Sequence, residues 1–230
     1  MIRVLLIGHG RMGALVERLA PEYGCEIAAV VTEESGEGAI EKGDFGPIDV
    51  AIDFSLPDAV PVNLPQLIRR KLNAVVGTTG WRAHEADLRA RVDAAGIGVL
   101  VSANFSVGMN IFALAVEAAA AKFAAQQGYG AWIHEMHHAA KIDAPSGTAL
   151  MLKSALERSG YDRPIDMSST RAGFAPGVHH VGFDGASESL TFTHEVRDRA
   201  VFARGALEAA TWLRGRRGWF TMRDMLESAM

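Results

Sequence analysis

The chain of 230 residues is 49% hydrophobic and 22% charged, which is enough to bury the core of one large domain or two small ones. Its formal net charge of −4 provides no basic surface for a phosphate backbone, and no stretch approaches the roughly 20 apolar residues of a membrane span, so neither nucleic acid nor a membrane is an expected partner. Cys25 is the only cysteine, which excludes an internal disulfide and a zinc site of paired thiolates, and we expect a reducing, cytoplasmic setting and no metal.

The predicted elements begin with a strand, a glycine-rich turn and a helix. Residues 2–7 form a short apolar run, and helical spacing of apolar residues begins after the turn. Within the turn, Gly8 suits a tight bend, Gly10 suits close approach of a pyrophosphate, and Gly13 suits packing of the helix on the strand. We therefore predict a dinucleotide-binding turn that also includes Arg11 and Met12. The alternative is a glycine turn used only for packing.

Glu33 follows the second predicted strand, residues 27–31, and arrives 20 residues after the glycine turn. A carboxylate at this spacing typically accepts hydrogen bonds from a ribose diol. Residues 33–44 carry five acidic side chains and one cation, Lys42, so there is no arginine where a 2′-phosphate would lie. We predict NADH or NADPH as the cofactor and favour NADH, although Arg11 or Lys42 can still reach the adenosine end.

Three further strands, at 50–54, 74–76 and 98–101, alternate with helices at 58–71 and 82–95. This alternation predicts a doubly wound parallel sheet, which binds ligands at the carboxyl ends of its strands. The residues that follow the last two strands are therefore predicted to line the cofactor crevice, and they are Gly77, Thr78, Thr79, Ser102, Ala103, Asn104 and Phe105. An ordinary strand-end turn explains the first three equally well.

Residues 135–149, with the sequence EMHHAAKIDAPSGTA, follow a predicted strand at 131–134 and gather side chains that do not help to fill a core. A nicotinamide supplies a hydride but no proton, so a reductase of a C=N or C=C–C=N unit needs an acid, and a dicarboxylate substrate needs cations. His137, His138 and Lys141 provide both kinds of group. The alternative is a surface loop of solvated side chains.

Ser146 is a suitable N-cap for a helix predicted at 149–156. The free N–H groups of Gly147 and Thr148 then make a carboxylate site that needs no charged side chain. One loop thus offers an acid, a cation and an anion site, which together predict a small dicarboxylate as the substrate.

The chain after this loop predicts a second sheet. Residues 187–194 alternate in polarity with Leu190 and Phe192 on one face, which is typical of an open mixed sheet whose apolar face needs a covering partner. Three further ionisable residues are explained at least as well by a solvated hairpin and stay outside the catalytic set: Arg171, His179 and His180.

We predict a Rossmann-like doubly wound parallel sheet and a smaller α+β domain with an open mixed sheet. The dinucleotide-binding domain is expected at 1–105, with 203–230 returning to it, and the substrate-binding and oligomerisation domain at 106–202. Within the returning segment we expect a helix at 205–213 and a last short helix capped by Thr221.

Residues 135–149 resemble the signature of the 4-hydroxy-tetrahydrodipicolinate reductase (dihydrodipicolinate reductase) family, Glu-x-His-His-x-x-Lys-x-Asp-x-Pro-Ser-Gly-Thr-Ala. The resemblance extends over nearly the whole chain, through similar segments at 10–13, 52–55, 76–80, 103–108, 202–206 and 210–213. It implies an NAD(P)H-dependent oxidoreductase of lysine and diaminopimelate biosynthesis.

The resemblance also implies roles for individual residues. His137 serves as proton donor or acceptor and Lys141 as proton donor, while His138, Gly147 and Thr148 hold the substrate carboxylates. The nicotinamide end of the cofactor is implied to lie on residues 77–79 and 102–105. A homotetramer formed through the second sheet is implied as well.

Two departures from the family pattern bear on the cofactor. The glycine turn is one residue shorter than in longer members, and a stretch before Thr170 is missing. An ungapped comparison places Thr32 at the family's acid and Glu33 at its arginine, so either residue can hold the ribose.

Two other functions remain as alternatives: an amino-diacid dehydrogenase of the aspartate or diaminopimelate type, and a non-catalytic NADH-binding sensor. The cation and the anion site within 141–148 favour the reductase, because they suit a dicarboxylated ring.

Overall fold

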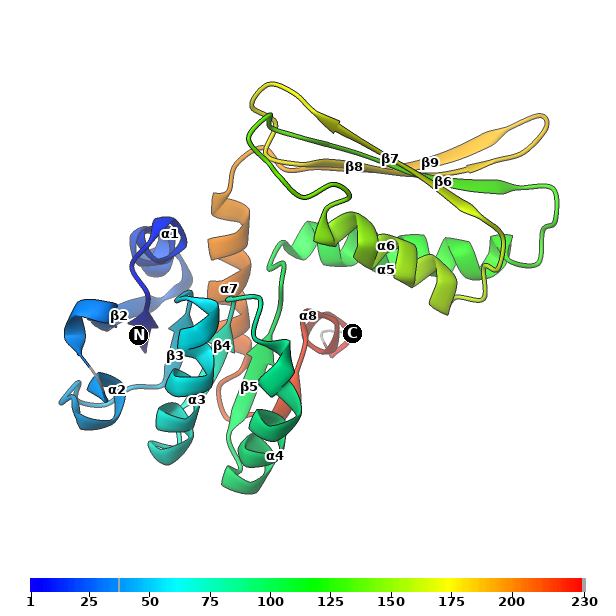
Figure 1. The fold of residues 1–230 in the computed structure, drawn as a ribbon. Coiled ribbons are helices and arrows are strands. Elements are labelled where there is room, and N and C mark those ends of the chain that lie inside the picture. Colours follow the sequence, from blue (N-terminus) through cyan, green and yellow to red (C-terminus); the bar gives the residue numbers. More distant parts are fainter. Residues whose placement is uncertain (37, 229–230) are drawn as a thin grey trace. The chain divides into compact units, whose positions relative to one another are not determined.

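The computed structural model describes residues 1–36 and 38–228, and the chain divides into two compact units. The first unit consists of Met1–Ser106 and Ala200–Met230, and the second of Val107–Arg199. Figure 1 shows a twisted sheet flanked by helices in the first unit and a separate, longer sheet in the second.

The described part of the first unit contains a six-stranded sheet in the order β10-β5-β4-β3-β1-β2, with every neighbouring pair parallel. Its strands are β1 (Ile2–Ile7), β2 (Cys25–Val31), β3 (Val50–Asp53), β4 (Asn73–Val76), β5 (Gly98–Val101) and β10 (Gly218–Phe220). The chain winds outward from β1 in both directions, so the strand order reverses beside β1. The prediction of a doubly wound sheet is confirmed, and its carboxyl ends at this reversal are where such sheets bind ligands.

Helices surround this sheet because the strands are buried on both faces. The longer helices are α1 (Arg11–Leu19), α3 (Val60–Arg69), α4 (Glu85–Ala95) and α7 (Ala200–Trp212), and the short ones are α2 (Ala39–Lys42) and α8 (Met222–Glu227). Helix α7 contacts α1 and the strands β3 and β4. Thr221 accepts a hydrogen bond from the Asp224 backbone N–H, so the predicted cap of the last helix is confirmed.

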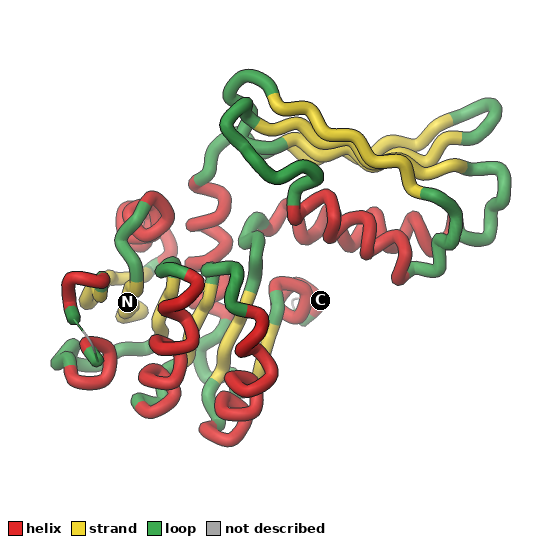
Figure 2. Tube along the Cα trace, in the orientation of Figure 1, coloured by secondary structure: helices red, strands yellow, loops and turns green. Residues whose placement is uncertain are grey.

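The second unit contains a four-stranded sheet in the order β7-β6-β8-β9 among its described residues, built from β6 (Gly130–His137), β7 (Ile165–Arg171), β8 (Val178–Asp184) and β9 (Ser189–Glu195). β6 pairs with β7 in parallel and with β8 antiparallel, which confirms the predicted mixed sheet. The helices α5 (Val107–Phe123) and α6 (Gly147–Arg158) lie against one face of it (Figure 2). Phe112, Ile133, Leu152, Val181 and Phe183 are buried in the core between helices and sheet.

Strand β6 is longer than the predicted strand at 131–134, and it carries Glu135 and His137 on the same face as Ala131 and Ile133. Polar side chains on a buried face hid the two-residue period, which is why the sequence suggested a loop from residue 135 onward. Both side chains are consequently held by strand backbone.

No helix in the described part of the chain is both long enough and apolar enough to cross a bilayer.

Candidate active site

A cavity of about 680 Å³ lies at the carboxyl ends of β1, β2 and β3. Four of its lining residues are Gly8, Gly10, Thr32 and Glu33, which the sequence assigned to the cofactor or left as its alternatives. A cavity at this edge of a doubly wound sheet is where a dinucleotide is expected.

The glycines of the turn have the geometry that such a site requires. Gly8 has a φ of +84°, and a Cβ on it would lie 2.5 Å from the Phe54 carbonyl oxygen. A Cβ on Gly13 would lie 2.2 Å from the Gly8 carbonyl oxygen, so only glycine lets the first turn of α1 pack this closely. A Cβ on Gly10 would meet no described atom within 4 Å, which leaves the backbone before α1 open to an anion.

Glu33 is exposed and opens a short 3₁₀ turn directly after β2. Thr32 caps this turn, and its backbone N–H donates to the Ser35 hydroxyl oxygen at a distance of 3.0 Å. Arg11 is exposed and Met12 half-buried at the start of α1. The Glu33 carboxylate is thus accessible at the cavity, whereas the Thr32 backbone is committed to the turn.

The segment 77–79 follows β4 and contains one buried, hydrogen-bonded residue and one exposed residue. The Thr78 hydroxyl is buried and donates to the Ser55 carbonyl oxygen at 3.2 Å, while Trp81 Nε1 donates to the Thr78 carbonyl oxygen at 2.7 Å. Thr78 therefore builds the turn, and Thr79 remains exposed beside it.

The segment 102–105 follows β5 and is closed by its own hydrogen bonds. The Ser102 hydroxyl donates to the Asn104 carbonyl oxygen at 2.8 Å and accepts from the Asn104 N–H at 3.1 Å. Phe105 is buried with its ring edge-on to that of Phe54, while Ala103 is exposed. The residues predicted to hold the nicotinamide end thus lie at the carboxyl edge of the sheet. Some of them stabilise the turns there, and others are exposed.

Asp53 is a support that the sequence did not single out. Its carboxylate is buried at the end of β3, where it accepts from the Ser55 N–H at 2.8 Å and from Asn63 Nδ2 at 3.1 Å. Burial raises the pKa of Asp53. An acid that ends an otherwise apolar strand is the signal that could have pointed to it.

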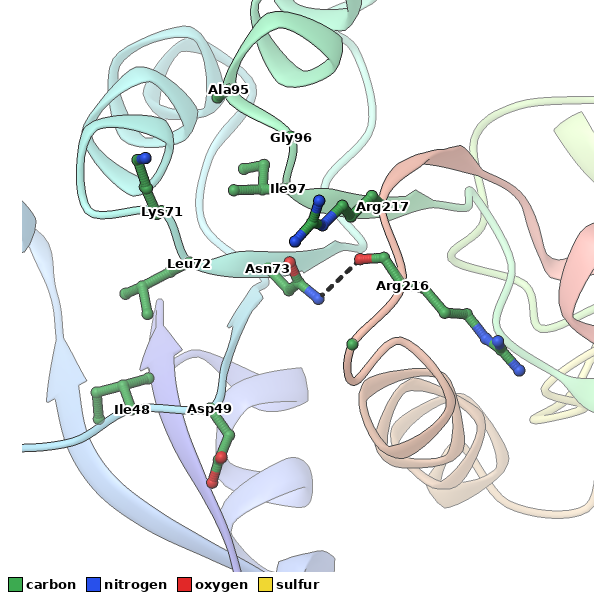
Figure 3. A pocket seen from close by; sticks show the side chains of 11 residues that line it. Ile48, Asp49, Lys71, Leu72, Asn73, Ala95, Gly96, Ile97, Arg216 and Arg217 are labelled. Atoms are coloured by element: carbon green, nitrogen blue, oxygen red, sulfur yellow. Dashed lines mark hydrogen bonds between the residues drawn. The ribbon is translucent and has the colours of Figure 1, made fainter.

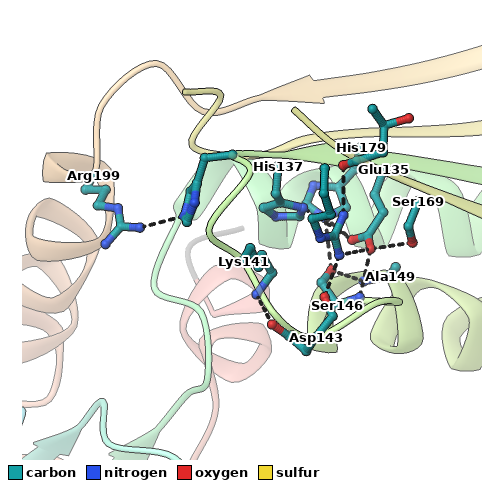
Figure 4. Close-up of polar contacts among 12 residues, drawn as sticks. Glu135, His137, Lys141, Asp143, Ser146, Ala149, Ser169, His179 and Arg199 are labelled. Atoms are coloured by element: carbon teal, nitrogen blue, oxygen red, sulfur yellow. Dashed lines mark hydrogen bonds and ion pairs between the residues drawn. The ribbon is translucent and has the colours of Figure 1, made fainter. Parts of the chain in front are cut away.

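In the second unit, the loop between β6 and α6 gathers the predicted chemical groups (Figure 4). His137 is the last residue of β6, Lys141 lies in the loop, and Gly147 and Thr148 are the first residues of α6. Ser146 is the N-cap of α6, as predicted, since its hydroxyl oxygen accepts from the Ala149 N–H at 3.2 Å.

A fully buried carboxylate, Glu135, holds this loop. Its Oε1 accepts from the Ser146 N–H at 2.9 Å, from the Ser169 hydroxyl at 2.7 Å and from Arg171 Nη2 at 2.7 Å. Burial acts to raise the pKa of Glu135, but the hydrogen bonds from Ser146, Arg171 and Ser169 outweigh it and lower the pKa to about 2. The carboxylate is therefore ionised throughout the physiological range.

Two imidazoles face the other oxygen of this carboxylate. Glu135 Oε2 lies 3.5 Å from His137 Nδ1 and 3.6 Å from His179 Nε2. Burial lowers the pKa of both histidines, to about 4 for His179, against the opposing effect of the carboxylate. Both rings are thus neutral at neutral pH in this structure.

Two further contacts order the cations of the loop. Lys141 Nζ lies 2.7 Å from the Asp143 carboxylate and lowers the pKa of that acid. Arg199 Nη2 lies 3.2 Å from His138 Nε2. Because a guanidinium only donates, His138 Nε2 accepts in this pair.

The solvated-hairpin interpretation of Arg171 and His179 is wrong. Both lie on the inner face of the second sheet against Glu135, and His179 is only 3% exposed. His180 points to the opposite face, where its Nδ1 lies 2.9 Å from the Thr193 hydroxyl. Strand pairing places Arg171 opposite His137 and His179 opposite Glu135, which is information that only the register contains.

Glu135, His137 and His179 bring ligand-type atoms within 4.8 Å of one another, as a metal site would. The Arg171 guanidinium already neutralises the same carboxylate, however, and this added charge opposes binding of a cation.

A second cavity, of about 470 Å³, lies at the amino ends of β3, β4, β5 and β10 (Figure 3). Asn73 is one of the residues that line it. Its amide N–H groups donate to the Leu213 and Arg216 carbonyl oxygens at 2.8 and 3.2 Å, and its amide oxygen accepts from the Gly98 N–H at 2.8 Å. Its amide therefore connects β4 and β5 to the segment that follows α7. None of the predicted site residues lines this cavity.

Comparison with protein families matches two models that together span almost the whole chain. Residues 2–105 match the N-terminus of dihydrodipicolinate reductase, and residues 108–226 match the C-terminus of dihydrodipicolinate reductase.

Individual relatives agree with these matches. The chain is 31% identical over 238 residues to the 4-hydroxy-tetrahydrodipicolinate reductase of Christiangramia forsetii and 38% identical over 240 residues to that of Stenotrophomonas maltophilia strain K279a, covering 98% of both partners in each case. A solved structure of dipicolinate-bound dihydrodipicolinate reductase from Paenisporosarcina sp. TG-14 has the same fold, with a TM-score of 0.81 at 21% identity and coverage of 96% of this chain and 97% of that one.

Proposed function

This chain belongs to the dihydrodipicolinate reductase family, and we propose that it reduces 4-hydroxy-tetrahydrodipicolinate with NADH or NADPH to tetrahydrodipicolinate. The observation that carries the proposal is the loop between β6 and α6, where a buried carboxylate, Glu135, lies against an imidazole and the helix cap, and an ammonium group is paired with Asp143 nearby. This arrangement has no purpose in an NADH-binding sensor.

The loop supplies what the reaction asks of the protein. When bound, the nicotinamide supplies a hydride to the ring carbon conjugated with the imine, and one proton must be added to complete the reduction. We assign that proton to Lys141, with His137 as proton donor or acceptor beside it. Lys141 is three-quarters buried and paired with Asp143, so we expect the substrate to displace this ion pair when it binds.

The substrate carboxylates are assigned to His138 and to the start of α6. The backbone N–H groups of Gly147 and Thr148 lie in the first turn of a twelve-residue helix, where the helix dipole adds to their attraction for an anion. His138 is kept in place by its contact with Arg199, a cation that adds to the positive field.

The cofactor is assigned to the first unit. The pyrophosphate is proposed to lie on Gly8, Gly10, Arg11, Met12 and Gly13, the ribose on Glu33, and the nicotinamide end on residues 77–79 and 102–105. The exposed Glu33 carboxylate supports a preference for NADH, because it would repel a 2′-phosphate.

The proposal is tested by following oxidation of NADH, and separately of NADPH, when freshly generated 4-hydroxy-tetrahydrodipicolinate is added. Rapid oxidation that depends on this substrate is expected, faster with NADH. A matched control supplies L-aspartate and diaminopimelate with the oxidised cofactors. Activity in the control without activity on the cyclic substrate would contradict the proposal in favour of an amino-diacid dehydrogenase.

We further propose a cytoplasmic homotetramer assembled through the outer face of the second sheet. That face presents Trp132, His134 and His180 as partly exposed side chains, with the last two rings stacked at 5.9 Å. Light scattering after size exclusion is expected to give about four times 24.6 kDa. A monomer would contradict this assembly.

A further inference from the structure

Glu135 makes contacts in two directions, and this is unusual for a carboxylate that touches neither proposed reactant. One oxygen, Oε1, accepts from the Ser146 N–H, immediately before the α6 N-terminus. The other, Oε2, faces His137 Nδ1 at 3.5 Å. The side chain has no exposed surface, so its ionised form is retained only because these contacts replace water.

The carboxylate oxygen that faces the histidines has no hydrogen-bond partner among the described residues. Glu135 Oε2 and His137 Nδ1 are both buried, and neither has a hydrogen bond within normal limits in the described residues. A proton on His137 Nδ1 would lie close to a full negative charge and be attracted by it, whereas a lone pair there would be repelled by the same charge at 3.5 Å. Electrostatics therefore favours the Nδ1–H form.

Gly177 lies beside the other ring nitrogen of His137. A Cβ on Gly177 would lie 3.0 Å from His137 Nε2, so the residue at this position keeps side-chain atoms away from that nitrogen. The two ring nitrogens thus have different surroundings: Nδ1 lies 3.5 Å from a buried acid, whereas Nε2 lies beside a glycine, in a side chain that keeps 9% of its surface exposed.

We propose that Glu135 is a positioning residue that fixes His137 in the Nδ1–H form, leaves Nε2 to exchange the proton, and holds the N-terminus of α6 in register with it. The inference rests on the function proposed above. It deepens that function because Glu135 contacts both His137 and the N-terminus of α6, where a substrate carboxylate is proposed to bind. The Glu135 side chain therefore sets the distance between the acid–base group and the substrate-binding site.

His179 and Arg171 complete this anchor. His179 Nε2 lies 3.6 Å from Glu135 Oε2 and 3.5 Å from the Ser146 hydroxyl, so it lies between the carboxylate and the helix cap. Arg171 Nη2 donates both to Glu135 Oε1 and to the Asp143 carbonyl oxygen, which ties the Lys141 loop to the same point. The anchor therefore reaches each part of the loop.

Glu135→Gln separates positioning from folding, because it keeps the shape of the side chain. The amide oxygen can still accept from Ser146, Ser169 and Arg171, so the amide NH₂ is turned toward the two histidines. His137 Nδ1 must then accept, and its proton moves to Nε2. We expect kcat to fall by about 10- to 100-fold with KM for the cyclic substrate nearly unchanged. Glu157→Gln on the exposed side of α6 is the matched control and should retain wild-type kinetics.

The pH profile should shift with a defined sign. Loss of the negative charge removes a stabiliser of the His137 imidazolium, while Lys141 and Arg171, which disfavour it, and Asp143, which favours it, remain. The pKa of His137 is therefore expected to fall further, and the corresponding limb of the kcat profile moves to lower pH.

The deciding measurement is the ¹⁵N spectrum of the histidine rings in the full-length protein, assigned for His137 with a His137→Gln variant. We expect Nδ1 protonated in wild type and Nε2 protonated in Glu135→Gln. An Nε2–H form in the wild type, or the same form in both proteins, would overturn the proposal, as would loss of wild-type activity on treatment with a chelator, since a metal would then organise the cluster. This readout needs no turnover, so its failure is distinguishable from an absence of reductase activity in the wild type.

Discussion

The two units prepare their ligand sites by opposite means. In the first, the groups at the cavity are mainly backbone: a bend at Gly8, a close contact at Gly13 and the open start of α1. In the second, a buried carboxylate, Glu135, is surrounded by an arginine, two imidazoles and a helix cap. The comparison indicates that the proposed cofactor site rests on backbone geometry, which does not titrate, whereas the proposed substrate site rests on buried ionisable groups and therefore depends on protonation.

The strongest test of this contrast is to remove a charge from the second unit. Lys141→Ala is expected to lower kcat by about 10²- to 10⁴-fold, because the reduction loses its proton donor, while NADH binding is unchanged. Steady-state kinetics and fluorescence titration with NADH measure the two effects. Lys153→Ala, on the exposed surface of α6, is the control. Undiminished turnover in the Lys141 variant, or loss of NADH binding, would contradict the assignment of Lys141 as the proton donor.

Acid should weaken the second unit through His179. Its pKa of about 4 in the folded protein lies below the usual value of 6.5, so the unfolded chain binds more protons between these values and the free energy of unfolding falls as pH drops from 6.5 to 4. When protonation is complete, the loss is on the order of 3 kcal/mol. Glu135 adds no slope there, because with a pKa of about 2 it affects stability only below about pH 4.5.

Urea unfolding across this pH range measures the effect in wild type and in His179→Gln. The variant should show a shallower dependence, and exposed His84→Gln should match wild type. Identical slopes in all three proteins would mean that the buried imidazole does not govern the acid response.

Steric substitutions in the glycine turn should break the first unit instead. Gly13→Ala places a Cβ 2.2 Å from the Gly8 carbonyl oxygen, so we expect a loss of about 1–3 kcal/mol of stability together with cofactor binding. Gly10→Ala has room for its methyl group and should fold normally, yet bind NADH more weakly. Thermal unfolding and NADH titration distinguish them, and equal stability losses in both variants would contradict this account of the turn.

The smallest expected effect concerns cofactor choice. Glu33→Ala should reduce the ratio of kcat/KM for NADH over NADPH by roughly tenfold, because it removes both a hydrogen bond to the ribose and repulsion of a 2′-phosphate. Glu34→Ala, at the neighbouring exposed position, is the control. An unchanged ratio would assign the ribose to Thr32.

The sequence predicts the first unit better than the second for a physical reason. Glycine spacing and apolar periodicity are local signals, so the glycine turn after β1, the doubly wound parallel sheet and the capped α6 helix could be predicted directly. Glu135 was recognised only as the first residue of a motif, because its partners Ser169, Arg171 and His179 lie 34 to 44 residues away and meet it through strand register. Local patterns do not encode that pairing.

The most direct test of the central claim, that this chain transfers a hydride to a cyclic dicarboxylated imine, uses NADH carrying deuterium at both C4 positions. Freshly generated 4-hydroxy-tetrahydrodipicolinate is converted in a single turnover, and the product is examined by mass spectrometry. The account predicts tetrahydrodipicolinate with one deuterium per molecule for each NADH oxidised. Oxidation of NADH without deuterium in the product, or no oxidation by folded protein that binds NADH, would contradict it.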